Sequence, residues 1–438
     1  MLILTGLFFN KKGNQSFYNS VKGYSQSYKI TILTAATLNS DVYHDLNKIK
    51  QELPHIRVIS VFPYKAFSYI SASLDFLKKM NFGVSKKSEN KVFAVNKSDK
   101  DAMLVNMPPT IKSKLSFYLR SYLLAISSFL HRLFNHVDVV CCYEINGSIA
   151  SSCLKKFFNI PVFIKLQGTA LGGKLNLIGT EEFNSVFSID IAEIKRSTSF
   201  DLAIMTNDGT RGDVVLNHFG FASEKILFLN NGIDSRFEKA IHSSTPIFEN
   251  GKLKSVKLCS VSRLTSWKRV DLILEIVHKL RGIIDISYTL IGIGSEKESQ
   301  SILEIIKELK LENNVTFLKG ASTEEVISVM SNSDLLISLN NFTNVSNPVF
   351  EALYIGIPVV TIHQSEFSEV LGPGMKSCVF VEEAKRSDLV SAVVNKISSI
   401  DMENYNELIS FSKEFREFFP TWELRSKKEL ARIARIIK

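Results

Sequence analysis

The chain has 438 residues, of which 45% are hydrophobic and 22% are charged. This composition is typical of folded globular proteins and excludes a disordered chain. Because single hydrophobic cores stop growing at about 250–300 residues, the length favours two or three domains.

The net charge of +9 is concentrated in one lysine-rich stretch. Residues 76–114 contain nine lysines, with only Glu89, Asp99 and Asp101 as acids. The stretch fits a solvated insertion near residues 80–112, or a contact with an anionic membrane surface or an acidic ligand. Nucleic acid is not an expected partner, since no aromatic-interleaved binding motif accompanies the lysines.

Cysteine usage and the amino terminus predict a cytoplasmic protein. The five cysteines lack metal-ligand spacing and are typical of buried, reduced thiols. The first residues lead directly into a predicted strand without a charged segment, so we expect no signal peptide. The longest apolar run, residues 121–130, is about half of the ~20 residues that a membrane span requires.

The first half of the chain alternates short apolar runs with segments of helical period, which is typical of βαβ units and parallel sheets. We predict strands at residues 2–7, 29–34, 56–61, 137–142, 161–166, 202–206 and 226–229. The lysine-rich insertion interrupts their regular spacing. This half is predicted to form one Rossmann-like domain over residues 1–235.

Residues 112–134 combine lysine and arginine with a broad apolar face. One hypothesis is a helix that lies on an anionic membrane, at the inner face of the cell membrane. The other is an ordinary domain helix whose apolar face belongs to the core. The sequence leaves both open.

The second half repeats the alternation in a more compact form. We predict strands at residues 256–261, 287–291, 315–318, 335–339, 359–362 and 378–381, with helices between them. They form a second Rossmann-like domain over residues 254–398, after a polar linker at residues 235–253. Residues 405–438 are predicted to be helical, and a return of this segment to the first domain is one option. The predicted fold is α/β, with two doubly wound parallel sheets that face a cleft.

Two cations follow the first strand of the second domain. Arg263 lies just past the predicted strand end, and Lys268 lies at the entrance to the next helix. Because ligands of open parallel sheets bind beyond the carboxyl ends of the strands, both can converge on one anion such as a diphosphate. Trp267 between them is more typical of a packing residue.

A short helix with both ends marked begins near Asn347. Asn347 is expected at the N-cap, Pro348 at the first helical position and Gly356 at the left-handed end. Free amides of Val345, Ser346 and Asn347 would then form an anion site at the positive end of the helix. Glu351, one turn further on, is a candidate acceptor for ribose hydroxyls.

Gly292 and Gly294 follow another predicted strand of this domain. Glycines at such a position either let a ligand approach the backbone closely or simply form a turn. We include both among the candidate substrate-binding residues.

At these residues the sequence resembles the retaining GT-B glycosyltransferases of family 4, the glycosyl transferases group 1 type. The resemblance covers about residues 225–400 and includes the segments at residues 231–234, 262–271, 290–294, 315–320 and 347–360. It implies that Arg263 and Lys268 bind the donor diphosphate, and that Glu351 is the second glutamate of the family's Glu-x7-Glu motif. Thr343 stands where the first glutamate would handle the donor sugar, which leaves a partner role for Asn344.

The resemblance is looser in the first half. Gly13 lies where the family has a glycine-rich loop near the donor phosphates, and Gln167 lies where the family often has a histidine close to the reacting carbon. Glu144, after another strand, is either a further candidate in the cleft or a surface carboxylate.

The resemblance implies a glycosyltransferase that moves a sugar from a nucleoside-diphosphate donor to a glycan or lipid-linked glycan acceptor. Retention of configuration, no metal, no cofactor and a role in polysaccharide or glycoconjugate biosynthesis are implied with it. Two alternatives stay open: a non-catalytic GT-B binding or activating subunit, and a nucleotide-sugar epimerase.

Overall fold

The computed structural model describes residues 1–7, 15–36, 49, 51–61, 108–169, 171–172, 177 and 179–437. The described residues divide into two compact units. The first unit holds those up to Leu229 together with those from Glu423 onward, and the second holds Asn230–Trp422. Most of the lysine-rich insertion predicted at residues 80–112 lies outside the described residues.

The first unit contains a sheet with strand order β3-β2-β1-β4-β5-β6-β7. Its strands are β1 (Leu2–Thr5), β2 (Ile30–Thr34), β3 (Ile56–Ser60), β4 (Val140–Tyr143), β5 (Val162–Leu166), β6 (Leu202–Asn207) and β7 (Ile226–Asn230). The pairs from β3 through to β6 are parallel. The predicted doubly wound α/β fold is therefore confirmed for this half.

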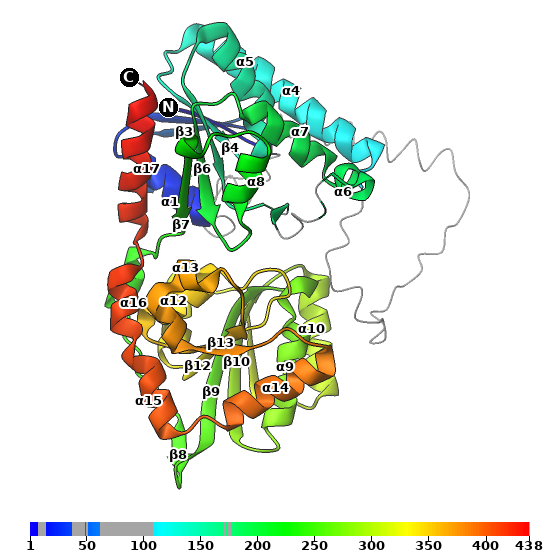
Figure 1. Cartoon of the computed structure of the whole chain (residues 1–438), viewed down its shortest axis with the longest axis vertical. Coiled ribbons are helices and arrows are strands. Elements are labelled where there is room, and N and C mark those ends of the chain that lie inside the picture. The colour runs from blue at the N-terminus through cyan, green and yellow to red at the C-terminus, as the bar shows by residue number, and fades with distance from the viewer. Residues whose placement is uncertain are drawn as a thin grey trace, which may run out of the picture. The chain divides into compact units, whose positions relative to one another are not determined.

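Helices cover both faces of the first sheet (Figure 1). One face packs against α4 (Ile111–Phe134), α5 (Ser148–Phe158), α6 (Glu181–Val186), α7 (Ser188–Ser197) and α8 (Gly212–His218), and the other packs against α1 (Gln15–Tyr24) and α17 (Trp422–Ile437). Because both faces are buried, strands such as β1 and β5 are mostly apolar, and every residue of these two strands is buried. No helix within the described part of the chain is long and apolar enough to cross a membrane.

Helix α17 is attached to the first sheet by buried charges. The Lys165 ammonium on β5 lies 2.5 Å from the Glu429 carboxylate, and Arg425 Nε lies 2.8 Å from the same carboxylate. Tyr24 on α1 also donates to Glu429. Burial opposes ionisation of Glu429, but Lys165 and Arg425 outweigh it and lower the pKa of this carboxyl to about 2. The carboxyl-terminal helix is thus an integral part of the first unit.

The second unit contains a sheet with strand order β11-β10-β9-β12-β13-β14, and β8 pairs antiparallel with β9. Its strands are β8 (Ile247–Glu249), β9 (Lys252–Arg263), β10 (Asp285–Ile293), β11 (Val315–Lys319), β12 (Leu335–Ser338), β13 (Val359–Ile362) and β14 (Cys378–Val381). The other pairs are parallel, so the predicted doubly wound sheet is confirmed here too.

Two buried clusters lie on the two faces of the second sheet. One involves α9 (Val270–Leu280), α10 (Glu296–Glu308), α14 (Arg386–Ser398) and α15 (Met402–Ser410), and the other involves α11 (Thr323–Ser331), α12 (Asn347–Ile355), α13 (Phe367–Leu371) and α16 (Ser412–Phe418). The sheet is therefore a rigid platform for the loops at its carboxyl edge.

The boundary between the units differs from the linker expected at residues 235–253. The second unit begins at Asn230, and it continues past residue 398 to Trp422. Ile233 accounts for both differences, because its amide donates to the Pro420 carbonyl at 2.9 Å and its carbonyl accepts from the Trp422 amide at 3.0 Å. Phe237 is buried in the core, and β8 joins the sheet. The polar composition of residues 235–253 thus predicts a linker, although a few apolar residues pack this segment against the second unit.

Candidate functional site

The strand order of the second sheet predicts where a ligand binds. The order reverses between β9 and β12, whose helical connections lie on opposite faces of the sheet. In open parallel sheets the loops after the two strands at such a reversal leave a crevice at their carboxyl ends. Arg263 ends β9, and residues 339–346 follow β12, so both predicted anion-binding elements border this position.

Arg263 and Lys268 meet at Trp267. The Arg263 guanidinium carbon lies 5.9 Å from the centroid of the Trp267 ring, and the Lys268 ammonium lies 3.9 Å from it. Neither cation forms an ion pair with any residue that the structure describes. Burial, with the nearby Arg263 charge, lowers the pKa of Lys268 to about 7. The structure therefore brings together two cations that have no ion-pair partner among the described residues.

The loop after β12 is hydrogen-bonded to the loop after β9. The Asn341 amide donates to the Trp267 carbonyl at 3.0 Å, and the Phe342 ring meets the Trp267 ring edge-on at 6.4 Å. Trp267 is thus the packing residue that joins the two loops, as expected, and it also lies against both cations.

Asn344 has a different role from the expected one. Its side chain is fully buried: Oδ1 accepts from the Asn340 amide at 2.8 Å, and Nδ2 donates to the Asn340 carbonyl at 2.9 Å. Its own amide donates to Gln364 Oε1 at 2.7 Å. The amide group of Asn344 therefore shapes the loop and is not open to a sugar. Gln364 was not predicted, although a polar residue just after β13 occupies a typical site position.

Helix α12 begins one residue earlier than predicted. Ser346, and not Asn347, is the N-cap, and the Asn347 side chain instead accepts from Asn231 Nδ2 at 2.9 Å. At the other end Gly356 has a φ of 106°, the left-handed conformation expected there. Pro348 stands in the first turn, where its missing N–H leaves no bond unmade.

The amides ahead of α12 are only partly free. The Val345 amide donates to Thr343 Oγ1 at 3.1 Å, so it is not the open donor that the sequence predicted. The Ser346, Asn347 and Val349 amides have no hydrogen-bond partner in the described part of the chain. The helix dipole adds to these three donors, and together they can hold an anionic oxygen.

Glu351 is buried in the second turn of α12 and makes no hydrogen bond to a described residue. Burial raises its pKa to about 7; the Asp234 charge adds to this rise, and Arg236 opposes it. A buried carboxyl that titrates near neutral pH is uncommon outside functional sites. The expected role as an acceptor for ribose hydroxyls fits its lack of a protein partner.

The two glycines after β10 serve packing. A Cβ at Gly292 would lie 2.7 Å from Leu264 Cδ2, and a Cβ at Gly294 would lie 2.9 Å from Leu264 Cβ. The Leu264 amide also donates to the Ile293 carbonyl at 2.9 Å. Leu264 thus fills the space beside both glycines, so their lack of a Cβ is required by packing, and a ligand contact to their backbone stays a prediction.

The first unit has its own polar cluster at the carboxyl edge of its sheet. Glu144 follows β4, and its Oε1 accepts from the Gln167 amide at 3.0 Å, while the Gln167 side chain donates to Tyr143. Burial raises the pKa of Glu144 to about 7, and the Asp208 charge adds to the rise. Gly13 lies outside the described residues.

Asp208 is a member of this cluster that the sequence did not single out. Burial raises its pKa to about 6, against the hydrogen bonds from Thr210, one of which spans 2.5 Å. A Cβ at Gly168 would lie 2.0 Å from Asp208 Oδ2, so a larger residue there would displace this carboxylate. The position after β6, in the pair Asn207 and Asp208, is the signal that could have found it.

Comparison with known proteins agrees with the arrangement of the second unit. Residues 245–415 match the family model described as glycosyl transferases group 1. The chain is 23% identical over 236 residues to N-acetyl-alpha-D-glucosaminyl L-malate synthase of Bacillus anthracis. This alignment covers 53% of the chain and 58% of that relative's length.

Solved structures resemble the whole chain. A glycosyltransferase from Rickettsia africae ESF-5 matches with a TM-score of 0.60 and 14% identity, over 100% of this chain and 98% of that one. HepE of Anabaena, solved with UDP and glucose, matches with a TM-score of 0.63 and 12% identity, over 99% of each chain. TarM matches with a TM-score of 0.61 and 14% identity, over 100% of this chain and 98% of that one.

Proposed function

We propose that the chain transfers a sugar from a nucleoside-diphosphate donor to a glycan or lipid-linked glycan acceptor, since residues 245–415 match the glycosyl transferases group 1 model and the chain has the GT-B fold. The proposal includes retention of configuration and a role in polysaccharide or glycoconjugate biosynthesis. It is supported by relatives solved with UDP, with UDP-glucose, and with UDP beside a GlcNAc-glycerol.

The observation that carries the proposal is the pair of cations Arg263 and Lys268, which have no ion-pair partner in the described part of the chain. As a glycosidic bond breaks, negative charge accumulates on the departing diphosphate. Arg263 and Lys268, joined through Trp267 to the loop that leads into α12, can stabilise that charge. Positive charge fixed in place before the reaction stabilises the transition state more than the ground state. The positive charge comes from the protein, so the proposed reaction needs neither a metal ion nor a cofactor.

The other donor contacts follow from the same loops. We assign Glu351 to ribose hydroxyls, and the Ser346 and Asn347 amides to a phosphate oxygen. Thr343, at the position of the family's first motif glutamate, offers only a hydroxyl that already accepts from Val345. Thr343 can make fewer contacts with the donor sugar than the motif glutamate would. We therefore propose that the donor differs from that of family members that carry the glutamate.

The acceptor is assigned to the first unit. Glu144 and Asp208 lie at the carboxyl edge of its sheet, and both have pKa values raised towards neutrality. Such carboxyls can accept hydrogen bonds from sugar hydroxyls and can exchange a proton near neutral pH. Gln167 does not titrate, so its contribution is limited to hydrogen bonding.

A panel of nucleotide sugars, incubated with and without glycan acceptors, tests the proposal. Release of nucleoside diphosphate that depends on an acceptor, with an α-configured donor yielding an α-linked product by NMR, is the expected result. Full turnover in the presence of EDTA is expected as well. Release without an acceptor, with a rearranged sugar, would identify an epimerase. Failure of every nucleotide sugar to bind would identify a non-catalytic subunit.

A further inference from the structure

Helix α4 carries an apolar stripe on its outer face. Six large residues of the helix are between 49% and 88% exposed, namely Ile111, Leu115, Leu119, Ile126, Leu130 and Leu133. They recur at intervals of three, four or seven residues, which places them along one side of an α-helix. Tyr122, also exposed, occupies the remaining step of this pattern. We call these residues the α4 stripe.

The buried side of α4 is smaller than its exposed side. Its buried residues are Ser121, Leu124, Ala125 and Ser128. Leu124 and Ala125 belong to the core of the first unit, as the alternative interpretation expects, but the residues of the α4 stripe do not. An exposed apolar stripe along a helix of about 36 Å is typical of a surface that binds a partner.

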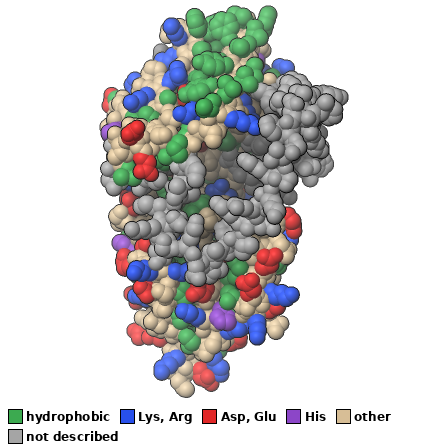
Figure 2. Space-filling model, turned by 90° about the vertical axis from the view of Figure 1, so that its right-hand side faces the viewer, with side chains coloured by type: hydrophobic (Ala, Val, Ile, Leu, Met, Phe, Trp, Pro, Cys, Tyr) green, Lys and Arg blue, Asp and Glu red, His purple; other side chains and the backbone are tan. Residues whose placement is uncertain are grey.

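All charged side chains of α4 itself are of one sign. Residues 108–137 include Lys112, Lys114, Arg120 and Arg132, and they contain no aspartate or glutamate. Figure 2 shows hydrophobic side chains gathered near the top of that view, with Lys and Arg side chains at their border. A second copy packed stripe against stripe would set cations against cations without a counter-charge, which disfavours a dimer through this face.

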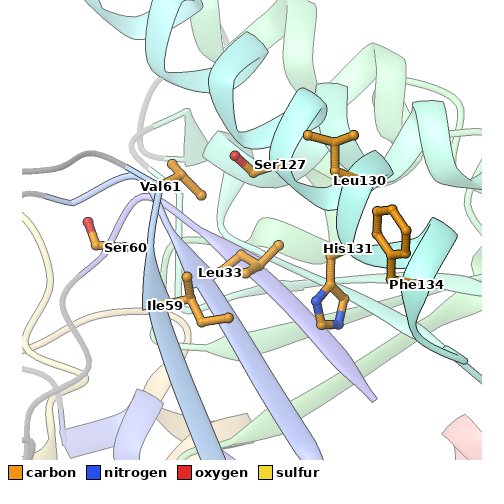
Figure 3. Close-up of a pocket in the computed structure, with 8 residues that line it drawn as sticks. All are labelled: Leu33, Ile59, Ser60, Val61, Ser127, Leu130, His131 and Phe134. Carbon is orange, nitrogen blue, oxygen red and sulfur yellow. The ribbon is translucent and has the colours of Figure 1, made fainter.

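An apolar hollow continues the surface at the carboxyl end of α4. It has a volume of about 440 Å³, and Leu130, His131 and Phe134 of α4 line it together with Leu33 and Ile59 of the sheet. Figure 3 shows these side chains from two strands and one helix around the space. Leu130 belongs to both the stripe and the hollow, so the apolar surface is continuous.

We propose that the α4 stripe and the hollow bind the surface of an anionic lipid bilayer. Apolar side chains on one face, cations beside them and the absence of acids are the features of a helix that lies in a membrane interface. Lysine and arginine near such a surface are each attracted to anionic lipids. The contact is independent of the proposed sugar transfer, because lipid binding is measured without any donor.

Flotation of the full chain with vesicles tests the proposal. We expect binding to vesicles of phosphatidylcholine with phosphatidylglycerol at about 0.05 M salt, loss of much of this binding at about 0.5 M salt, and little binding to phosphatidylcholine alone. Absence of binding to the anionic vesicles at low salt would overturn the proposal.

Two variants separate the apolar and the charged contributions. The first variant replaces Leu119, Ile126 and Leu133 with glutamine. It should reduce the amount of vesicle-bound protein at least about tenfold. The second variant replaces Lys112, Lys114 and Arg120 with glutamine. It should weaken binding to anionic vesicles by about a hundredfold. Unchanged binding of the first variant would also overturn the proposal.

The matched control replaces exposed apolar residues of the second unit. Ile241, Ile283 and Ile293 are 55% to 72% exposed, and their substitution by glutamine should leave vesicle binding unchanged. Circular dichroism and thermal unfolding report whether each variant is folded. The proposal would also be overturned if the wild type does not bind vesicles and forms a dimer in light scattering that is lost in the stripe variant. That result would assign the face to a second copy.

Discussion

Arg263 and Lys268 are the residues on which the proposed chemistry depends. Replacing either with alanine removes a cation from the departing diphosphate, and we expect turnover to fall by about a hundredfold or more. Steady-state kinetics with the donor found in the panel measures the change. Lys279→Ala, an exposed lysine on α9 of the same unit, should leave turnover unchanged. Near-normal turnover in both site variants would contradict the assignment.

Lys268 should also make nucleotide binding depend on pH. Its pKa of about 7 means that the free protein loses this charge as pH rises above 7, whereas a bound diphosphate favours the charged form. Affinity should therefore be constant below about pH 7 and fall above it, by at most about tenfold per pH unit. Calorimetry in two buffers of different ionisation enthalpy should show proton uptake above pH 7, and Lys268→Gln should abolish it.

At the scale of elements, the sequence predicts where the strands lie, but it does not decide the exact end of a helix. The predicted strands agree with the observed ones to within a few residues, because fully buried parallel strands require unbroken apolar runs. The N-cap of α12 was misplaced by one residue, since Ser346 and Asn347 are both good capping residues. Contacts with Asn231, far away in sequence, decide between them.

Gly356 ends α12 and gives a prediction about the element itself. With a φ of 106°, the position is strained for any residue with a Cβ, so Gly356→Ala should destabilise the protein by more than about 1 kcal/mol. Urea unfolding measures this loss. Gly282→Ala is the control, because that glycine lacks a positive φ and a Cβ there would meet only the Lys279 carbonyl at an ordinary 3.5 Å. Equal stabilities of the two variants would contradict the account of this helix end.

At the scale of the whole molecule, α17 carries the chain from the second unit back to the first. Its buried Glu429 is the carboxylate that pairs with both Lys165 and Arg425, so Glu429→Gln leaves these two buried cations without their shared counter-charge. We expect a loss of about 3–5 kcal/mol in the free energy of unfolding of the first unit. Glu423→Gln, which breaks an exposed pair with Lys427 on the same helix, should change stability little.

The same carboxylate implies a direction for acid unfolding. Because the folded-state pKa of Glu429 is about 2 and its ordinary value is 4.5, its contribution to stability is present above pH 4.5 and is lost as pH falls towards 2. The wild-type protein should lose more stability than Glu429→Gln over that range. Equal acid sensitivity of the two proteins, followed by circular dichroism, would assign the loss to other groups.

The amino-acid sequence by itself determined the α/β class, the two doubly wound sheets and the presence of cations after β9, since periodicity and strand-end position are local properties. Only the tertiary structure decided what the polar residues near those ends do. Asn344 holds its own loop, and Leu264 fills the space beside Gly292 and Gly294. It also showed that the large apolar residues of α4 face solvent. Each of these outcomes depends on contacts that form only in the folded structure, and a local sequence pattern does not contain that information.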